Sequence, residues 1–237
     1  MSLRKPLTSA VEGRVIYVLL LVVLVQSIYP ITASNSIIPV LIYQTCYMSL
    51  IFTGVLVVRD HPIYVRLLIV LGVAWAVTGG VYAFNQEATW ALLGGYTVIA
   101  AFQIMVAFVL FSYLFSTRRV NRDVIYAACA VYLLLGAIFV PIYGIIESVT
   151  YAFEGQHAFA ESSISHGDVF PWQTFIYYSY STLTTLGYGD VLPITMAARS
   201  AAALEAIVGV LYIAIIISRL VGLYSVENAE AKVDESG

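Results

Sequence analysis

Charged residues are scarce in this sequence: Asp, Glu, Lys and Arg make up only 11% of its 237 residues, whereas apolar residues make up 61%. Soluble globular domains carry about 25% charged residues, so the composition excludes a soluble domain and is typical of a protein that crosses a membrane several times. A helix needs about 20 apolar residues to span a bilayer. We therefore predict an all-α membrane protein with six transmembrane helices, at approximately 13–31, 37–58, 63–84, 91–115, 124–146 and 195–222.

Cysteine is also scarce, and both cysteines, Cys46 and Cys129, fall inside predicted membrane helices. They indicate no disulfide framework, and we interpret them as small apolar side chains. The sequence contains no HExxH motif for a metal, no GxxxxGK[ST] motif for a phosphate and no nucleophile–base pair with a plausible shared site. We therefore expect no enzymatic activity and no cofactor, and we expect no nucleic-acid partner.

The few basic residues are distributed unevenly. When six helices are threaded with both ends on one side, only Arg199 falls on the opposite side. The positive-inside rule makes the basic side cytoplasmic, so we expect a multi-pass protein of the plasma membrane with both termini in the cytoplasm. The first apolar stretch continues to Ile31, and we expect it to span the membrane rather than to be cleaved as a signal peptide. The residues on the basic side are Arg4, Lys5, Arg14, Arg59, Arg66, Arg118, Arg119, Arg122, Arg219 and Lys232.

A short motif lies between the last two apolar stretches. An apolar and aromatic stretch, 171–184, is too short to span and predicts a re-entrant helix, with Pro171 at its start. The sequence then reads Thr184-Thr185-Leu186-Gly187-Tyr188-Gly189-Asp190. Consecutive carbonyls point the same way only if alternate residues adopt left-handed backbone angles, which glycine does without steric cost. A row of carbonyls at fixed spacing can replace the hydration shell of a potassium ion.

The run Thr185–Gly189, TLGYG, resembles the selectivity filter of tetrameric potassium channels, and the resemblance extends from about Val124 to Leu223. It implies that K+ binds at the first four residues of this run, with the Thr185 hydroxyl as the innermost ligand and with Leu186 and Tyr188 pointing outward. One such motif per chain cannot close a ring, so the resemblance implies a homotetramer around a central pore in the lipid bilayer. K+ is then the permeant ion, and no cofactor is needed.

The resemblance also assigns residues that support the filter. Tyr177 and Tyr178 align with an aromatic cuff that holds the filter at fixed diameter, and we expect Tyr178 to donate a hydrogen bond to Asp190. Tyrosines at the membrane interface are the alternative interpretation. The C-terminal end of the re-entrant helix, from Ser181 to Thr184, would direct its negative dipole end at the central cavity. Some family members carry a glutamate at the position of Ser181, and this chain lacks it.

In the last apolar stretch, Gly209 stands where the family has a gating hinge. Glycine weakens a helix by about 1 kcal/mol relative to alanine, which favours bending, but close helix packing explains a glycine equally well. Val210, Ile213 and Ile217 follow at helical spacing, and we expect them to line the cavity or the gate.

Glu205 is a carboxylate inside a predicted membrane helix, where it costs about 2.5–3.5 kcal/mol on insertion scales unless it has a partner or a proton. On a helix, Glu205 would lie on a different face from Val210, Ile213 and Ile217. We expect it to lie behind the re-entrant helix, where a hydroxyl of Ser179, Thr182 or a tyrosine could bind it. Our hypothesis is that Glu205 braces that helix, and a proton-linked role in gating is the alternative.

Two further groups of residues allow two interpretations each. Small residues of the third stretch allow close helix packing, and a ligand pocket is the alternative; they are Gly72, Ala76, Gly79 and Gly80. The external stretch 148–170 is interpreted as a solvated turret, and a divalent-ion or proton site is the alternative. Its titratable residues are Glu154, His157 and Glu161, placed at the spacing of one helix face, followed by His166 and Asp168.

The fourth stretch, 91–115, contains no basic residue. Each elementary charge that moves across the membrane contributes about 2.3 kcal/mol per 100 mV, so steep voltage gating is not expected. We divide the chain into a four-helix domain 1–115, a cytoplasmic linker 116–123, a pore domain 124–223 and a short acidic tail 224–237. The predicted function is passive, potassium-selective conduction, and a non-conducting modulatory subunit of a heteromeric channel is the alternative.

Overall fold

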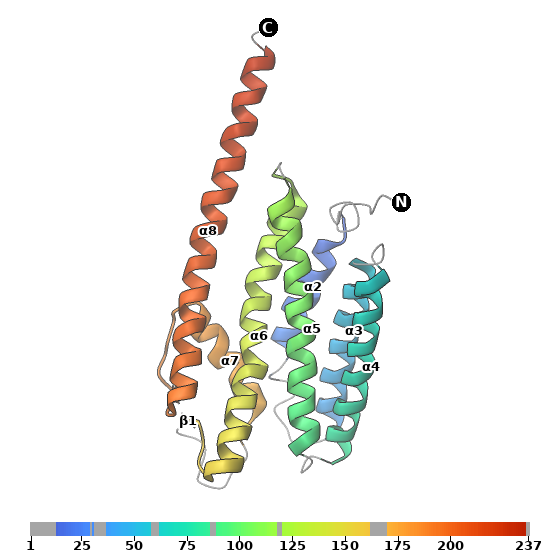
Figure 1. Cartoon of the computed structure of the whole chain (residues 1–237), viewed down its shortest axis with the longest axis vertical. Helices are drawn as coiled ribbons and strands as arrows, with labels where there is room; N and C mark the ends of the chain where they lie inside the picture. Colours follow the sequence, from blue (N-terminus) through green and yellow to red (C-terminus); the bar gives the residue numbers. More distant parts are fainter. Residues whose placement is uncertain are drawn as a thin grey trace.

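The computed structural model describes residues 13–28, 30, 37–57, 62–85, 89–117, 120–161 and 170–235, and these are almost entirely helical (Figure 1). The helices are α2 (Val15–Ser27), α3 (Ile37–Val57), α4 (Pro62–Phe84), α5 (Thr89–Ser116), α6 (Arg122–Glu154), α7 (Trp172–Leu183) and α8 (Met196–Glu235). Two short strands, β1 (Phe159–Glu161) and β2 (Val191–Pro193), pair antiparallel with Ala160 opposite Leu192.

Each predicted membrane stretch contains a helix. Within the described residues, four segments are long and apolar enough to cross a membrane: Pro62–Tyr82, Trp90–Ser116, Arg122–Glu154 and Met196–Ser225. α3 has 21 residues, none of them charged, whereas the apolar helix α2 has only 13. Successive long helices run in opposite directions (Figure 1). The chain is therefore a multi-pass membrane protein.

The helix α6 starts and stops where the sequence provides caps. The side chain of Asn121 accepts a hydrogen bond from the Val124 N–H at 2.9 Å, which caps the first turn. At the other end the helix stops at Gly155, whose φ of 68° is left-handed. α6 thus continues beyond residue 146, the predicted end of this span, as far as Glu154.

The helices α2 to α5 do not form a separate body. α5 and α2 both pack against α6, and the buried face of α2 carries valines at helical spacing, among them Val18 and Val22. Where α5 meets α6, a Cβ on Gly144 would overlap the ring of Tyr96, so a glycine is needed for this approach. α6 therefore shares one hydrophobic core with the helices that precede it and with α7.

Arg219 joins α8 to the end of α5. Its Nη2 donates to the carbonyl oxygens of Leu114 at 3.0 Å, Phe115 at 2.9 Å and Thr117 at 3.0 Å. The guanidinium carbon also lies 4.7 Å from the centroid of the Phe115 ring. A cation here satisfies the carbonyls that a helix leaves unpaired at its C-terminal end.

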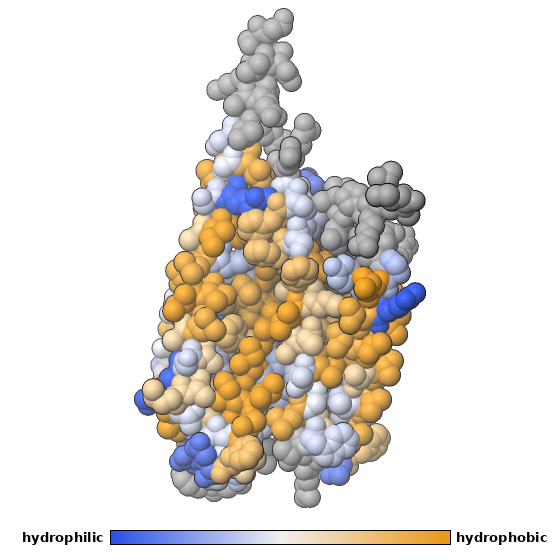
Figure 2. All heavy atoms as spheres, viewed as in Figure 1, coloured by the Kyte–Doolittle hydropathy of each residue, from blue (hydrophilic) through white to orange (hydrophobic). Residues whose placement is uncertain are grey.

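Most of α8 is uncovered in the single chain. In the most apolar 18-residue segment of α8 only 11% is buried, whereas in the corresponding segment of α6 56% is buried. Figure 2 shows hydrophobic residues over the middle of the molecule and hydrophilic residues gathered mainly toward its two ends. A surface of this kind requires lipid or another protein surface to cover it.

Candidate functional site

The short helix α7 is fixed to α6 by its polar side chains. Ser179 Oγ donates to the carbonyl oxygen of Gly136 at 2.7 Å, and Tyr180 Oη donates to that of Leu133 at 2.8 Å. A Cβ on Gly136 would lie 2.6 Å from a ring carbon of Tyr180, so the missing side chain permits the contact. These contacts set the position of the C-terminal end of α7, from which residues 184–190 continue.

Residues 184–190, hereafter the 184–190 loop, have the predicted alternating backbone. φ is positive at Thr185 (59°), Gly187 (55°) and Gly189 (80°), but not at Leu186 or Tyr188 between them. Thr185 is the one non-glycine residue with positive φ in the described part of the chain. A β-branched residue rarely adopts this conformation, and such strain clusters at functional sites.

The hydrogen bonds of the loop involve its N–H groups. Thr185 N–H donates to the carbonyl of Thr182 at 2.9 Å, and the N–H groups of Leu186 and Gly187 donate to that of Ser181 at 2.8 and 3.2 Å. By contrast, no backbone N–H of the described residues donates to the carbonyl oxygens of residues 184–188. A buried carbonyl needs a partner, so these oxygens are available to a cation if the loop is enclosed.

The loop is exposed along its whole length in the single chain. The apolar side chains of Leu186 and Tyr188 are 55% and 68% exposed. The ring of Tyr188 stacks on that of Tyr177, with centroids 6.3 Å apart and an interplanar angle of 6°. Thr184 lies at the base of the loop, where its hydroxyl donates to the carbonyl of Tyr180 at 2.7 Å.

The predicted hydrogen bond from Tyr178 to Asp190 is wrong, because Tyr177 makes it. Tyr177 Oη donates to Asp190 Oδ2 at 2.7 Å. Tyr178 is buried on the other side of α7, edge-on to Tyr143 at 5.0 Å and to Phe159 at 5.3 Å. Neighbouring residues on a helix point about 100° apart, so only one of the two tyrosines can face the loop.

We expect a double-mutant cycle to detect the bond between Tyr177 and Asp190. Tyr177→Phe, Asp190→Ala and the double variant should give a coupling free energy of about 1.5 kcal/mol, because one partner is a carboxylate. The measurement is the free energy of unfolding in mixed detergent and SDS. The matched cycle with Tyr178→Phe and Asp190→Ala should give a coupling near zero, and equal coupling in both cycles would contradict the assignment.

Glu205 lies buried at the meeting point of α6, α7 and α8, with no exposed surface. Its Oε1 lies 2.5 Å from Ser179 Oγ, and its Oε2 accepts a hydrogen bond from Tyr143 Oη. Two of the predicted partners, Ser179 and a tyrosine, are confirmed, whereas Thr182 is not among its hydrogen-bond partners. Ser179 has a single hydroxyl proton, so it can bond both Gly136 and Glu205 only if Glu205 carries a proton and donates it to Ser179.

Gly209 is the point at which α8 meets the end of α7. A Cβ at this position would overlap the carbonyl oxygen of Leu183 and would lie 3.0 Å from its Cδ1. α8 runs as one helix through Gly209. The contact with Leu183 supports the interpretation that Gly209 allows close helix packing. The nearby Val210, Ile213 and Ile217 are 53%, 44% and 57% exposed, so this chain alone does not cover them.

The external stretch differs from the prediction. Glu154 belongs to α6, Glu161 lies in β1 and His157 lies between them, so these residues do not share a helix face. The partner of His157 is Glu147, which sequence reasoning missed: Glu147 Oε1 lies 2.5 Å from His157 Nδ1, and Oε2 accepts from the Ala158 N–H at 2.7 Å. His166 and Asp168 lie outside the described residues. Among those that are described, no group of three or more His, Cys, Asp or Glu could hold a metal ion.

Comparison with known families matches residues 127–225 to a family model described as ion channel. The match begins in α6, contains α7 and the 184–190 loop, and ends in α8. Neither the curated proteins nor the solved structures gave a match to this chain. Residues 127–225 of this membrane protein are therefore similar to an ion channel domain.

Proposed function

We propose that this chain is the subunit of a homotetrameric, potassium-selective channel that conducts passively through the 184–190 loop. The observation that carries the proposal is the backbone of that loop. Its φ angles alternate from Thr185 to Gly189. The N–H groups of residues 185–187 donate to carbonyls of α7, and the carbonyl oxygens of residues 184–188 have no backbone donors among the described residues. Such a column of carbonyl oxygens is suited to replace the hydration shell of K+.

Four copies are proposed because one loop supplies only one column of oxygens, and an ion must be surrounded. A cyclic arrangement around the loop gives every copy the same environment. It would also cover the exposed side chains of Leu186 and Tyr188 and part of the apolar surface of α8. In this arrangement Val210, Ile213 and Ile217 would line the cavity below the loop.

Weak dependence on voltage is proposed because α5 contains no Lys or Arg from Thr89 to Ser116. The proposed orientation places both termini in the cytoplasm of a cell bounded by its plasma membrane. It is supported by α2 beginning at the end of the molecule at which α8 terminates (Figure 1) and by the positive-inside rule.

The experiment that tests the proposal is the reversal potential of the purified chain in planar bilayers, with potassium on one side and sodium on the other. We expect reversal close to the potassium equilibrium potential and an open probability that varies little with voltage. Reversal near zero would refute potassium selectivity. Absence of current from assembled protein would favour the non-conducting subunit.

A further inference from the structure

The chain that leaves the 184–190 loop is held by a short segment of the external stretch. Val191 follows the loop directly and begins β2, which pairs antiparallel with β1. Beyond the strand, the carbonyl oxygen of Ala158 accepts from the N–H groups of Ile194 at 2.8 Å and of Thr195 at 3.3 Å. Ala158 and β1 therefore set the position at which the loop ends.

Ala158 is in turn held by a carboxyl group of α6. Glu147 Oε2 accepts from the Ala158 N–H at 2.7 Å, and Glu147 Oε1 lies 2.5 Å from His157 Nδ1. Glu147 is only 6% exposed and Ala158 is fully buried, and a buried N–H group requires an acceptor. Glu147 Oε2 can accept whether the proton shared with His157 lies on the oxygen or on the nitrogen.

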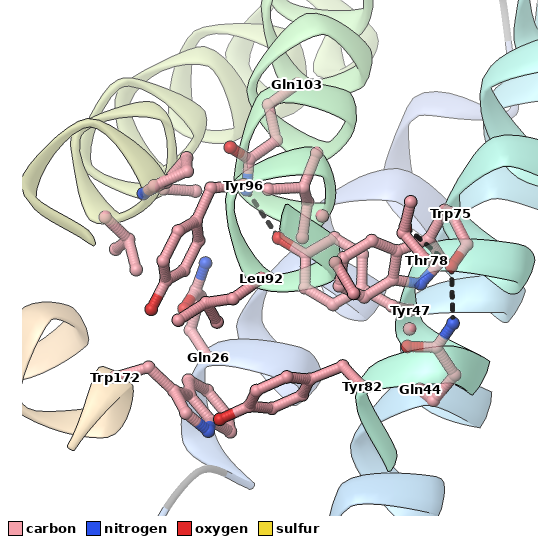
Figure 3. A pocket seen from close by; sticks show the side chains of 17 residues that line it. Gln26, Gln44, Tyr47, Trp75, Thr78, Tyr82, Leu92, Tyr96, Gln103 and Trp172 are labelled. Carbon is pink, nitrogen blue, oxygen red and sulfur yellow. Dashed lines mark hydrogen bonds between the residues drawn. The ribbon is translucent and has the colours of Figure 1, made fainter. Parts of the chain in front are cut away.

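The packing of α6 against α5 supports this contact. Gly144 lies about one helical turn before Glu147, and a Cβ there would overlap the ring of Tyr96. Tyr96 also lines a cavity of about 80 Å³ among α3, α4 and α5, together with Val140 and Pro141 of α6 (Figure 3). Glu147 therefore projects from a part of α6 whose position is set by α5 and not by the loop.

We propose that Glu147 is a positioning residue for ion selectivity, because it joins α6 to the end of the 184–190 loop through Ala158. The beginning of the loop is attached to α6 as well, since Ser179 and Tyr180 of α7 donate to carbonyl oxygens of that helix. One helix thus sets the distance between the two ends of the loop, and with it the spacing of the carbonyl oxygens. Discrimination between K+ and Na+ depends on these oxygens.

A second contact limits what the loss of Glu147 would do. Thr174 Oγ1 of α7 donates to Glu161 Oε2 of β1 at 3.2 Å. β1 is therefore attached to α7 as well as to α6, so removal of the Glu147 contact should shift the strands without detaching them.

The test compares two replacements of similar size. Glu147→Leu removes the acceptor, whereas the amide of Glu147→Gln can still accept from Ala158 and donate to His157. The measurement is the ratio of K+ to Na+ permeability of the purified, assembled protein in planar bilayers. We expect Glu147→Leu to lower this ratio about tenfold, the factor that corresponds to one lost hydrogen bond to a carboxyl group. Glu147→Gln should keep the ratio within about threefold of the unmodified chain.

A merely structural role would lower the amount of assembled protein and leave the permeability ratio unchanged. An unchanged ratio in Glu147→Leu, or an equal loss in Glu147→Gln, would therefore overturn the proposal. The matched control is Glu154→Leu, at an exposed glutamate of the same helix that accepts from Gln156; it should leave the ratio unchanged. If Glu147→Leu does not assemble, His157→Phe serves, because it keeps a ring beside Tyr151 but cannot bond Glu147. An unchanged ratio in His157→Phe would then overturn the proposal.

The inference rests on the proposed function, in which the 184–190 loop is the ion pathway, and hydrogen exchange separates the two because it needs no ion flux. In Glu147→Leu, the backbone amides of residues 157–161 and 190–196 should exchange about tenfold faster than in the unmodified chain, because the contact that holds them is lost. Faster exchange in a chain that is not selective would refute the proposed function and retain the positioning of the loop by Glu147. Unchanged exchange at residues 190–196 would overturn that positioning even if the permeability ratio fell.

Discussion

Gly209→Ala is expected to abolish ion flux, even though alanine is the better helix former. The new Cβ would overlap the carbonyl oxygen of Leu183, which belongs to the backbone and cannot rotate away as a side chain could. Overpacking of this kind costs about 1–3 kcal/mol, and alanine recovers about 1 kcal/mol of helix propensity. The net cost is therefore up to about 2 kcal/mol, which lowers the equilibrium constant for the native packing by up to about thirtyfold. The displaced residue directly precedes the 184–190 loop, so the loop moves with it.

The measurement is ion flux into proteoliposomes, together with the melting temperature of the purified protein. Gly222→Ala is the matched control on the same helix, because a Cβ there meets nothing within 4 Å. It should leave both values close to those of the unmodified chain. If Gly209→Ala remained fully stable and altered only the kinetics of opening, the hinge interpretation would be correct and the packing interpretation wrong.

Glu205→Leu is expected to destabilise the chain by about 1–3 kcal/mol, because the buried hydroxyl of Tyr143 loses its acceptor. Tyr143 Oη would be left buried with no acceptor from Glu205, whereas Ser179 would keep its bond to Gly136. The free energy of unfolding in mixed detergent and SDS measures the loss. A change below about 0.5 kcal/mol, the size typical of an uninvolved surface site, would contradict the bracing role.

Glu205→Gln separates bracing from proton-linked gating. The amide NH2 can donate to Ser179 and the amide oxygen can accept from Tyr143, so the neutral replacement reproduces every contact of a protonated Glu205. We therefore expect stability within about 0.5 kcal/mol of the unmodified chain and an unchanged dependence of ion flux on pH. Loss of that pH dependence in the Gln variant would instead show that Glu205 titrates during gating.

Some of the site could be predicted because its causes are local. The alternating backbone of the loop follows from the positions of Gly187 and Gly189, and no distant residue is needed to infer it. The burial of Glu205 against hydroxyls follows from the cost of a carboxyl group in an apolar helix. The helices themselves follow from the length of the apolar stretches.

Other features depend on contacts between distant residues and could not be predicted. The choice between Tyr177 and Tyr178 depends on the rotation of α7 about its axis, which α6 sets through Ser179 and Tyr180. The pairing of Glu147 with His157 depends on how the chain turns after Gly155. The cavity among α3, α4 and α5 corresponds to no sequence motif, because the residues that line it come from helices that are separated along the chain.

The hydrogen bonds of Arg219 have a consequence for how the two parts of the chain can move. The end of α5 is attached to α8 by a direct contact as well as by the peptide that connects α5 to α6. Sideways displacement of α8 at Arg219 must therefore either break these hydrogen bonds or carry the end of α5 along. α5 has no charged residue for an electric field to displace. A movement of α8, the helix that follows the 184–190 loop, would nevertheless be transmitted to the end of α5 through the hydrogen bonds of Arg219.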